Sequence, residues 1–239
     1  YNYATSDLAC VIDRVERLGA TRILYVVGAP QAQHLEMVGV VSRKAGWVPE
    51  TTQMVHVAFG NVLGNDRKIL KSRSGEVVKL DALLTEAVER AGTSVREKNA
   101  ELSVEQQSEI ARQVGIGAIK YADLSTDRIK DYVFDWERML SFDGNTSPYL
   151  QYAHARICSI FRKAQIERQS VRSVTPTLEH DAERALALRL LQFDTAVWDT
   201  LDKYSPHRLC TYLYDLASEF SSFYEHCPVL RAESEAQKM

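Results

Sequence analysis

The chain lacks any long apolar run. A helix that crosses a bilayer needs about 20 consecutive apolar residues, so no membrane-spanning segment is expected, and no pattern typical of a signal peptide appears. The four cysteines, Cys10, Cys158, Cys210 and Cys227, show no paired spacing of the kind that binds metals. We therefore expect a cytoplasmic protein with reduced thiols, no structural metal site and no membrane partner.

The chain also lacks an excess of positive charge. Its 29 Lys and Arg are outnumbered by 32 Asp and Glu, which gives a formal net charge of −3. Such a charge provides no overall attraction to nucleic acid. Any RNA site must therefore be a local patch, and no DNA partner is expected. With 239 residues there is room for one large or two small domains with a real core.

The most informative feature that is present is a basic stretch, Arg67 to Gly75, with four cations in its first seven residues. Lys68 and Lys71 lie three apart, and Ser72 follows the second lysine. Ammonium groups, hydroxyls and backbone N–H groups arranged in this way can surround an oligophosphate. The alternative is a solvated turn with no ligand.

Upstream of the basic stretch, the pattern predicts a strand–helix–strand unit. Residues 21–27 are expected to form a buried strand of a parallel sheet, because residues 23–27 are a continuous apolar run. Residues 31–44 are expected to form a helix and residues 55–59 a second strand. Ligands of open α/β sheets bind at the carboxyl ends of the strands. Two groups of residues follow those ends: Gly28, Gln31 and His34 after the first, and Phe59, Gly60 and Asn61 after the second.

Beyond residue 79 the pattern is helical. Residues 80–90 and 181–202 are expected to form amphipathic helices. Ser103 caps another helix, which we expect Gly115 and Gly117 to break.

A helix that begins near Pro148 carries a local excess of positive charge. Residues 154–172 include five Arg or Lys and one acid, Glu167. Such a surface binds phosphates, and tyrosines on it can stack on an unpaired base. The alternative is a solvated basic helix whose tyrosines pack into a helical bundle. The candidate RNA contacts are Tyr149, Tyr152, Arg156 and Lys163.

Several blocks of residues are specific enough to compare with a known family. They are Tyr3-x-x-x-Asp7, Tyr25-Val26-Val27-Gly28, His56-Val57-Ala58-Phe59-Gly60, Lys68-Ile69-Leu70-Lys71-Ser72, Asp131-Tyr132-x-Phe134-Asp135, Pro148-Tyr149-Leu150-Gln151-Tyr152 and Cys227-Pro228-Val229-Leu230. Together they resemble the arginyl-tRNA synthetases of the bacterial type, a class I family, in register from residue 1 to about residue 232. The basic block keeps both lysines and the Ser of the family's Lys-Met-Ser-Lys-Ser loop.

The resemblance implies an α/β fold followed by an all-α one. Residues 1–146 would be the second half of a Rossmann-like parallel-sheet catalytic domain with connecting helices. Residues 147–239 would be an anticodon-binding helical bundle. The implied activity is that of an arginine–tRNA ligase, which activates L-arginine with ATP and transfers it to tRNA(Arg), with Mg²⁺ accompanying the ATP.

The resemblance also assigns an arginine site to Tyr3, Asp7 and Gln31. A carboxylate such as that of Asp7 can accept two parallel N–H bonds from the substrate guanidinium. Tyr3 lies one helical turn before Asp7, so both can reach one ligand. The alternative is that Asp7 merely caps a helix over residues 8–18.

For ATP, the resemblance implies that His34, His56, Phe59 and Gly60 frame the adenosine. Glycine at position 60 would let the backbone approach the nucleotide. Lys68, Lys71 and Ser72 are the catalytic candidates, and the lysines would stabilise the departing pyrophosphate. One donor aimed at such charge contributes roughly 3 kcal/mol, so loss of Lys71 is expected to slow activation about a hundredfold.

One motif of the family is missing: no His in this chain is followed two residues later by Gly, so there is no His-x-Gly-His. We expect a fragment that begins inside the catalytic domain and is inactive alone. Two alternatives remain: a paralogue that binds tRNA without ligase activity, and an enzyme that passes activated arginine into a biosynthetic pathway.

Overall fold

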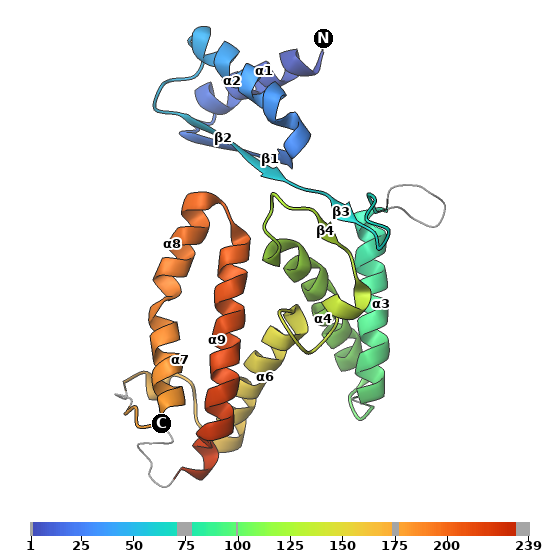
Figure 1. Cartoon of the computed structure of the whole chain (residues 1–239), viewed down its shortest axis with the longest axis vertical. Coiled ribbons are helices and arrows are strands. Elements are labelled where there is room, and N and C mark those ends of the chain that lie inside the picture. Colours follow the sequence, from blue (N-terminus) through green and yellow to red (C-terminus); the bar gives the residue numbers. More distant parts are fainter. Residues whose placement is uncertain (1, 71–77, 99, 174–176, 233–239) are drawn as a thin grey trace. The chain divides into compact units, whose positions relative to one another are not determined.

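The computed structural model describes residues 2–70, 78–98, 100–173 and 177–232 (Figure 1). The chain divides into two compact units: a first unit of residues 1–69 and 128–133, and a second unit of residues 70–127 and 134–239. The first unit contains a parallel β-sheet with helices, and the second is helical, which confirms the predicted fold class. In the described ranges, no helix is long and apolar enough to cross a membrane.

The first unit is built around two parallel strands. Its elements are α1 (Tyr3–Glu16), β1 (Arg22–Gly28), the 3₁₀ turn η1 (Ala29–Gln31), α2 (Ala32–Lys44), β2 (Gln53–Phe59), β3 (Val62–Leu63) and β4 (Tyr132–Val133). β1 and β2 pair in register from Arg22 opposite Gln53 to Gly28 opposite Phe59. A second, short parallel pair joins β3 to β4.

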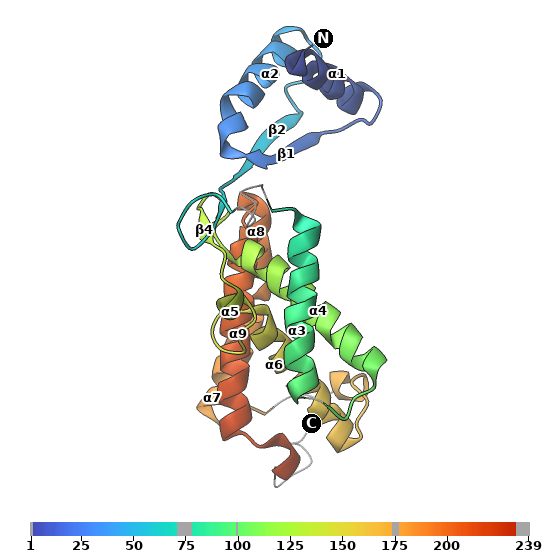
Figure 2. The same cartoon turned by 90° about the vertical axis from the view of Figure 1, so that its right-hand side faces the viewer.

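The core of this unit lies between the helices and one face of the sheet. Val11 of α1, Val38 of α2 and Val48 are buried together. Tyr25 of β1 and Met54 of β2 pack against them. Both helices lie on the same side of the β1–β2 sheet (Figure 2).

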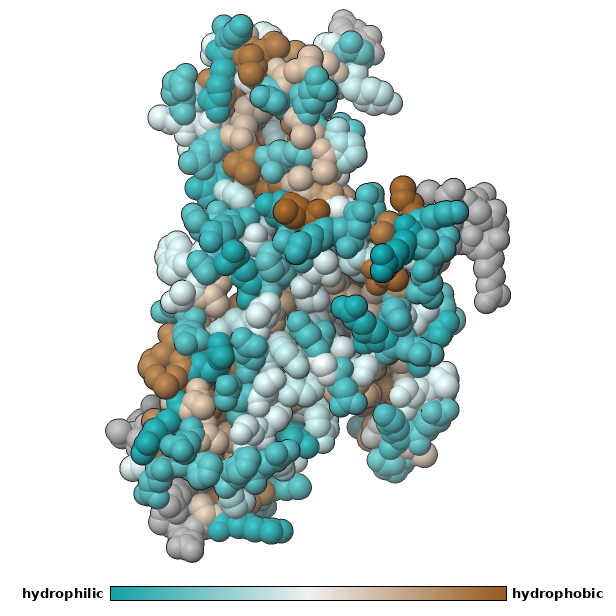
Figure 3. Space-filling view, viewed as in Figure 1, coloured by the Kyte–Doolittle hydropathy of each residue, from teal (hydrophilic) through white to brown (hydrophobic). Residues whose placement is uncertain are grey.

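The other face of β1 is exposed, contrary to the expectation of a strand buried on both faces. The exposed fraction is 44% for Leu24 and 62% for Val26, whereas Ile23 between Arg22 and Leu24 is buried. Side chains of a strand alternate between faces, and α1 and α2 cover only one of them. Apolar side chains are accordingly visible among polar ones on the surface of the protein (Figure 3).

The second unit is a set of helices. They are α3 (Leu80–Lys98), α4 (Val104–Ser125), α5 (Trp136–Met139), α6 (Ser147–Ala164), η2 (Ser170–Ser173), α7 (Asp181–Leu191), α8 (Phe193–Lys203), α9 (Pro206–His226) and η3 (Val229–Arg231). α3 packs along α4, while α9 contacts α4, α6, α7 and α8. Ala153 of α6 packs with Ala217 and Phe220 of α9 to form the core of the bundle.

The prediction that Gly115 and Gly117 break a helix is wrong. α4 runs through both glycines without interruption. A Cβ at Gly115 would lie 2.6 Å from the carbonyl oxygen of Ala87 on α3, and one at Gly117 would lie 2.8 Å from Oγ of Ser147. The glycines therefore serve close approach of neighbouring elements rather than helix termination.

The single helix predicted over residues 181–202 is two helices. α7 ends at Leu191 and α8 begins at Phe193. The N–H of Gln192 bonds to the carbonyl of Arg189, 3.1 Å away. This three-residue spacing is tighter than the four-residue spacing of an α-helix, so it ends the regular turn of α7.

Candidate active site and RNA surface

The candidate active site lies where β1 and β2 end. Gly28 and Phe59 are the last residues of the two strands and face each other in the ladder. η1 and α2 continue from Gly28, and the Gly60–Asn61 turn continues from Phe59. Sequence reasoning expected these two groups at one edge of a parallel sheet, and the observed register confirms that arrangement.

A carboxylate–imidazole pair joins the first two helices. Nε2 of His34, in the first turn of α2, lies 2.6 Å from Oδ2 of Asp7 on α1. The side chains of His34 and Asp7 are 32% and 38% exposed, so both remain accessible to a ligand. The family resemblance assigned Asp7 to arginine and His34 to ATP, and nothing in the sequence indicated that the two side chains meet.

Asp7 does not cap its helix, so the capping alternative is wrong. α1 begins at Tyr3, and its N-cap is Asn2, whose Oδ1 accepts the N–H of Thr5 at 3.1 Å. Asp7 lies within the helix, one turn after Tyr3. Its carboxylate is therefore available for a role other than capping.

The other two candidates for the arginine site are exposed. Tyr3 is 89% exposed at the start of α1. Gln31 ends η1 and precedes α2, three residues before His34. Tyr3 thus lies on α1, and Gln31 directly precedes α2, the two helices that the Asp7–His34 pair joins.

Two of the ATP candidates lie on β2. Nε2 of His56 donates a hydrogen bond to the carbonyl oxygen of Val27 on β1, 3.1 Å away, so Nε2 carries the proton. This bond fixes the ring between the two strands, close to their carboxyl ends. Phe59 is the last residue of β2 and is 44% exposed.

The need for glycine at position 60 is explained by close contacts with another segment of the first unit. A Cβ at this position would lie 2.7 Å from the carbonyl carbon and oxygen of Lys130 and 2.8 Å from Oδ1 of Asp131. The N–H of Gly60 also bonds to the carbonyl of Arg128 at 2.7 Å. Residues 128–131 therefore occupy the space that glycine leaves open, and a role for Gly60 at ATP stays a prediction.

This segment, residues 128–133, adds site residues that sequence reasoning missed. Nη1 of Arg128 donates to the carbonyl of Ala58 at 2.6 Å. Oδ1 of Asp131 accepts the backbone N–H of Asn61 at 2.6 Å and its side-chain amide at 3.2 Å. The only signal was that Asp131 begins one of the blocks that carried the family resemblance. The segment holds the turn that follows β2.

The basic stretch is described only as far as Leu70. The carbonyl of Lys68 accepts the N–H of Gly64 at 2.8 Å, and Arg67 has a left-handed backbone, φ 58°. These bonds make a tight turn between β3 and Ile69, and the Lys68 side chain is exposed. Lys71 and Ser72 lie outside the described residues.

The candidate RNA surface lies on α6, in the second unit. The guanidinium carbon of Arg156 lies 4.6 Å from the ring centre of Tyr152 and 4.8 Å from that of Tyr224 on α9. Nη2 of Arg156 also donates to the Tyr152 hydroxyl at 3.1 Å. Tyr152 is 47% exposed, and Lys163 is exposed near the end of the helix. Stacking thus holds a cation at the surface between two aromatic rings.

Tyr149 behaves differently from the other candidates on α6. Its hydroxyl lies 3.2 Å from Oγ of Ser221, and its ring centre lies 5.6 Å from that of Tyr214, both on α9. The ring is part of the packing between α6 and α9, as the alternative interpretation expected. An RNA contact of Tyr149 stays a prediction.

Two family comparisons divide the chain in the same order as the fold. The family described as tRNA synthetases class I (R), catalytic domain, matches residues 1–136. The DALR anticodon binding domain matches residues 150–239. The division that we predicted after residue 146 falls between these ranges and stays a prediction.

Individual proteins that are similar to this chain belong to the same family. An arginine–tRNA ligase of Thermobifida fusca is 56% identical over 98% of this chain and 40% of its own length. One of Yersinia pseudotuberculosis is 50% identical over 98% of this chain and 41% of its own length. The crystal structure of arginyl-tRNA synthetase from Plasmodium falciparum superposes with a TM-score of 0.83 at 32% identity, covering 100% of this chain and 40% of that one.

The chain thus spans about 41% of the length of the curated relatives that it matches. More than half of its residues match the catalytic family, and residues 150–239 match an anticodon-binding one. The chain therefore belongs to the class I tRNA synthetase family of the arginine type.

Proposed function

We propose that the chain is part of an arginine–tRNA ligase that activates L-arginine with ATP and transfers it to tRNA(Arg) in the cytoplasm. The observation that carries this proposal is the accessible carboxylate of Asp7, held beside His34 at the carboxyl edge of the parallel strands. Relatives that share half or more of the residues are named arginine–tRNA ligases, which supports the same substrate.

The chemistry of arginine fits this carboxylate. A guanidinium is a planar fork of N–H donors, and a carboxylate accepts it with two parallel bonds. In the described part of the chain, the bond to His34 is the only hydrogen bond that Asp7 makes through its side chain. A substrate can therefore bind Oδ1 directly and exchange with His34 at Oδ2. Tyr3 and Gln31 would bind the remaining polar groups of arginine.

The activation step needs no nucleophile from the protein. The arginine carboxylate attacks the α-phosphate of ATP in line and pyrophosphate leaves, so positioning and electrostatic stabilisation supply the catalysis. His34, His56, Phe59 and Gly60 would frame the adenosine. Lys68, Lys71 and Ser72 would bind the phosphates as their charge develops.

Magnesium would accompany ATP rather than occupy a site of its own. In the described residues, no three His, Cys, Asp or Glu side chains cluster closely enough to hold a metal ion. Mg²⁺ is commonly held by substrate phosphates with only one or two protein carboxylates, so the residues present are compatible with an ion carried by the nucleotide. When bound, it would neutralise charge on the phosphates.

The second unit would bind the tRNA. Tyr152 and Lys163 are exposed on α6, and the half-buried Arg156 stacks on the Tyr152 ring. Contacts of this kind stack on unpaired bases and pair with phosphates, so their strength falls with salt. This matches a domain that reads an anticodon loop.

The test is arginine-dependent exchange between ATP and labelled pyrophosphate, measured with the complete gene product in the presence of tRNA(Arg). The proposal predicts exchange that requires arginine and that Lys71→Ala slows about a hundredfold. If the complete gene product shows no arginine-dependent exchange but still binds tRNA, it is instead a tRNA-binding paralogue. Arginyl transfer to an acceptor other than tRNA would make it a pathway enzyme.

A further inference from the structure

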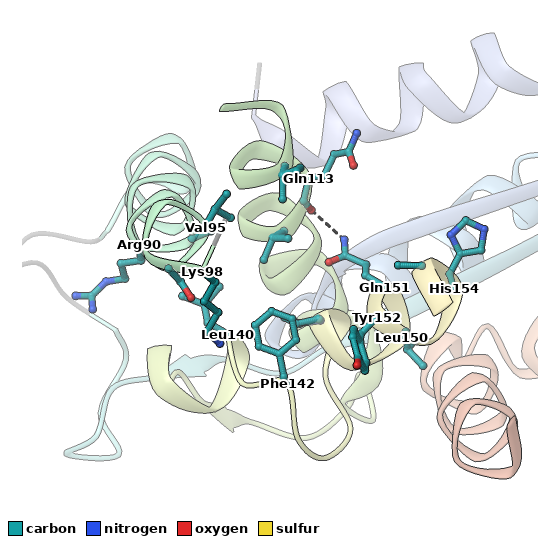
Figure 4. Close-up of a pocket in the computed structure, with 16 residues that line it drawn as sticks. Arg90, Val95, Lys98, Gln113, Leu140, Phe142, Leu150, Gln151, Tyr152 and His154 are labelled. Carbon is teal, nitrogen blue, oxygen red and sulfur yellow. Dashed lines mark hydrogen bonds between the residues drawn. The ribbon is translucent and has the colours of Figure 1, made fainter. Parts of the chain in front are cut away.

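A cleft in the second unit is not used by the activation step proposed above, although Tyr152, a candidate tRNA contact, borders it. It has a volume of about 700 Å³ and lies between α3, α4, the segment after α5, and α6 (Figure 4). Its apolar wall includes Val95, Leu140 and Leu150. Pockets of 300 to about 1,000 Å³ with mainly apolar walls and a few polar groups are typical of small-molecule sites.

One polar side chain that lines the cleft has an atom without a partner among the described residues. Oε1 of Gln151 on α6 is buried, and no described residue donates a hydrogen bond to it. The orientation of this amide is fixed, because its Nε2 donates to the carbonyl of Gln113 on α4 at 3.1 Å. Figure 4 shows the oxygen pointing away from α6 toward α3. A buried acceptor without a donor costs free energy, so a ligand that supplies an N–H to Gln151 is favoured.

Aromatic and cationic groups line the same cleft. The rings of Phe142 and Tyr152 both border it. Nζ of Lys98 lies 4.6 Å from the centre of the Phe142 ring and has no carboxylate partner in the described part of the chain. Arg90, the other α3 cation that lines the cleft, is already engaged, because it pairs with Glu86 at 2.7 Å. Lys98 is therefore the cation available to an anionic ligand.

We propose that this cleft binds a nucleotide. Its base would lie on the Phe142 ring and donate an N–H to Oε1 of Gln151, while its phosphate would approach Lys98. The three requirements are a flat aromatic body, an N–H donor on its edge and a negative charge. A purely apolar ligand would leave the Gln151 oxygen unsatisfied, and a simple anion would leave the apolar walls and the rings without a partner.

The same chemistry is offered by a free nucleotide and by one nucleotide of an RNA chain. The binding itself does not depend on the ligase proposal; only the assignment to an RNA chain rests on it, because the ligase supplies tRNA as the partner. Uridine 5′-monophosphate is a suitable probe, since N3–H is the only N–H on its base.

The experiment measures binding of uridine 5′-monophosphate to the complete gene product by saturation-transfer NMR. The expected result is binding that Lys98→Met weakens roughly tenfold and Phe142→Leu weakens at least about fivefold. The N3-methylated nucleotide, which lacks the donor, should also bind about tenfold more weakly. Lys120→Met removes the same charge from an exposed position on α4 outside the cleft and should leave binding unchanged.

Two results overturn the proposal: no binding of uridine 5′-monophosphate at about 10 mM, or binding that Lys98→Met and N3-methylation both leave unchanged. If tRNA(Arg) displaces the bound nucleotide, the natural ligand of the cleft is a nucleotide of an RNA chain. If the nucleotide stays bound in the presence of tRNA(Arg), the natural ligand is a free nucleotide. Arginine-dependent exchange is measured on the same variants. Exchange without nucleotide binding refutes only the cleft, whereas nucleotide binding without exchange refutes only the ligase.

Discussion

Gly115 and Gly92 form a matched pair of glycines on the facing helices α4 and α3. Replacing either by alanine removes the same backbone freedom, which favours a helix by about 1 kcal/mol. The two sites differ in what the added methyl group meets. At Gly115 it would lie 2.6 Å from the carbonyl oxygen of Ala87 and 2.7 Å from the backbone nitrogen of Val88. At Gly92 its nearest neighbour is the mobile end of the Arg96 side chain, 3.2 Å away.

These contacts decide the sign of each effect. Backbone atoms of α3 cannot rotate away, so Gly115→Ala forces the two helices apart, and the upper part of the range for overpacking applies, about 2–3 kcal/mol. After the gain of about 1 kcal/mol in helix propensity, the free energy of unfolding should fall by roughly 1–2 kcal/mol. For Gly92→Ala the guanidinium moves aside, so the free energy of unfolding should stay level or rise by up to about 1 kcal/mol.

Urea unfolding followed by circular dichroism at the helical band measures both variants. In a protein of this size, 1 kcal/mol corresponds to roughly 2–4 °C in Tm, so thermal unfolding provides a second reading. The reasoning is refuted if Gly115→Ala is as stable as the parent, or if Gly92→Ala is destabilised by as much as Gly115→Ala.

Three further predictions concern the other sites. Asp131→Ala removes the acceptor for two N–H groups of Asn61 and should lower the free energy of unfolding by about 1–2 kcal/mol, as read from urea midpoints. Burial raises the pKa of the Cys210 thiol to about 11. Its contribution to stability is therefore complete below the ordinary thiol value of 9.0 and is lost as pH rises to about 11, and Cys210→Ala should lack this decline in pH-dependent unfolding. Arg156→Ala should weaken tRNA binding by the complete product and reduce its salt dependence in filter binding, whereas an unchanged salt slope would contradict a phosphate contact.

Secondary structure could be predicted from the sequence where it depends on the hydrophobic pattern of neighbouring residues. The apolar runs of β1 and β2 and the helix between them were predicted from periodicity, and the parallel register then brought Gly28 next to Phe59. Parallel pairing of consecutive strands is a general rule for a strand–helix–strand unit, so the common edge could be anticipated without coordinates.

Contacts between distant residues could not be predicted in the same way. Asp7 and His34 are 27 positions apart, and the sequence around neither residue predicts a hydrogen bond between them. Asp131 reaches Asn61 across 70 positions. The glycine at position 115 was interpreted from local propensity, which favours a break, but its neighbour Ala87 belongs to another helix. Tertiary packing outweighed propensity there.

The most direct test of the account is the effect of Asp7→Asn on the two substrates of the complete gene product. The substitution keeps the shape of the side chain but removes the charge that would hold the guanidinium, which contributes about 1.5–3 kcal/mol. In arginine-dependent pyrophosphate exchange, the KM for arginine should rise roughly ten- to hundredfold while the KM for ATP changes little. Equal increases for arginine and ATP would contradict the assignment of Asp7 to the guanidinium.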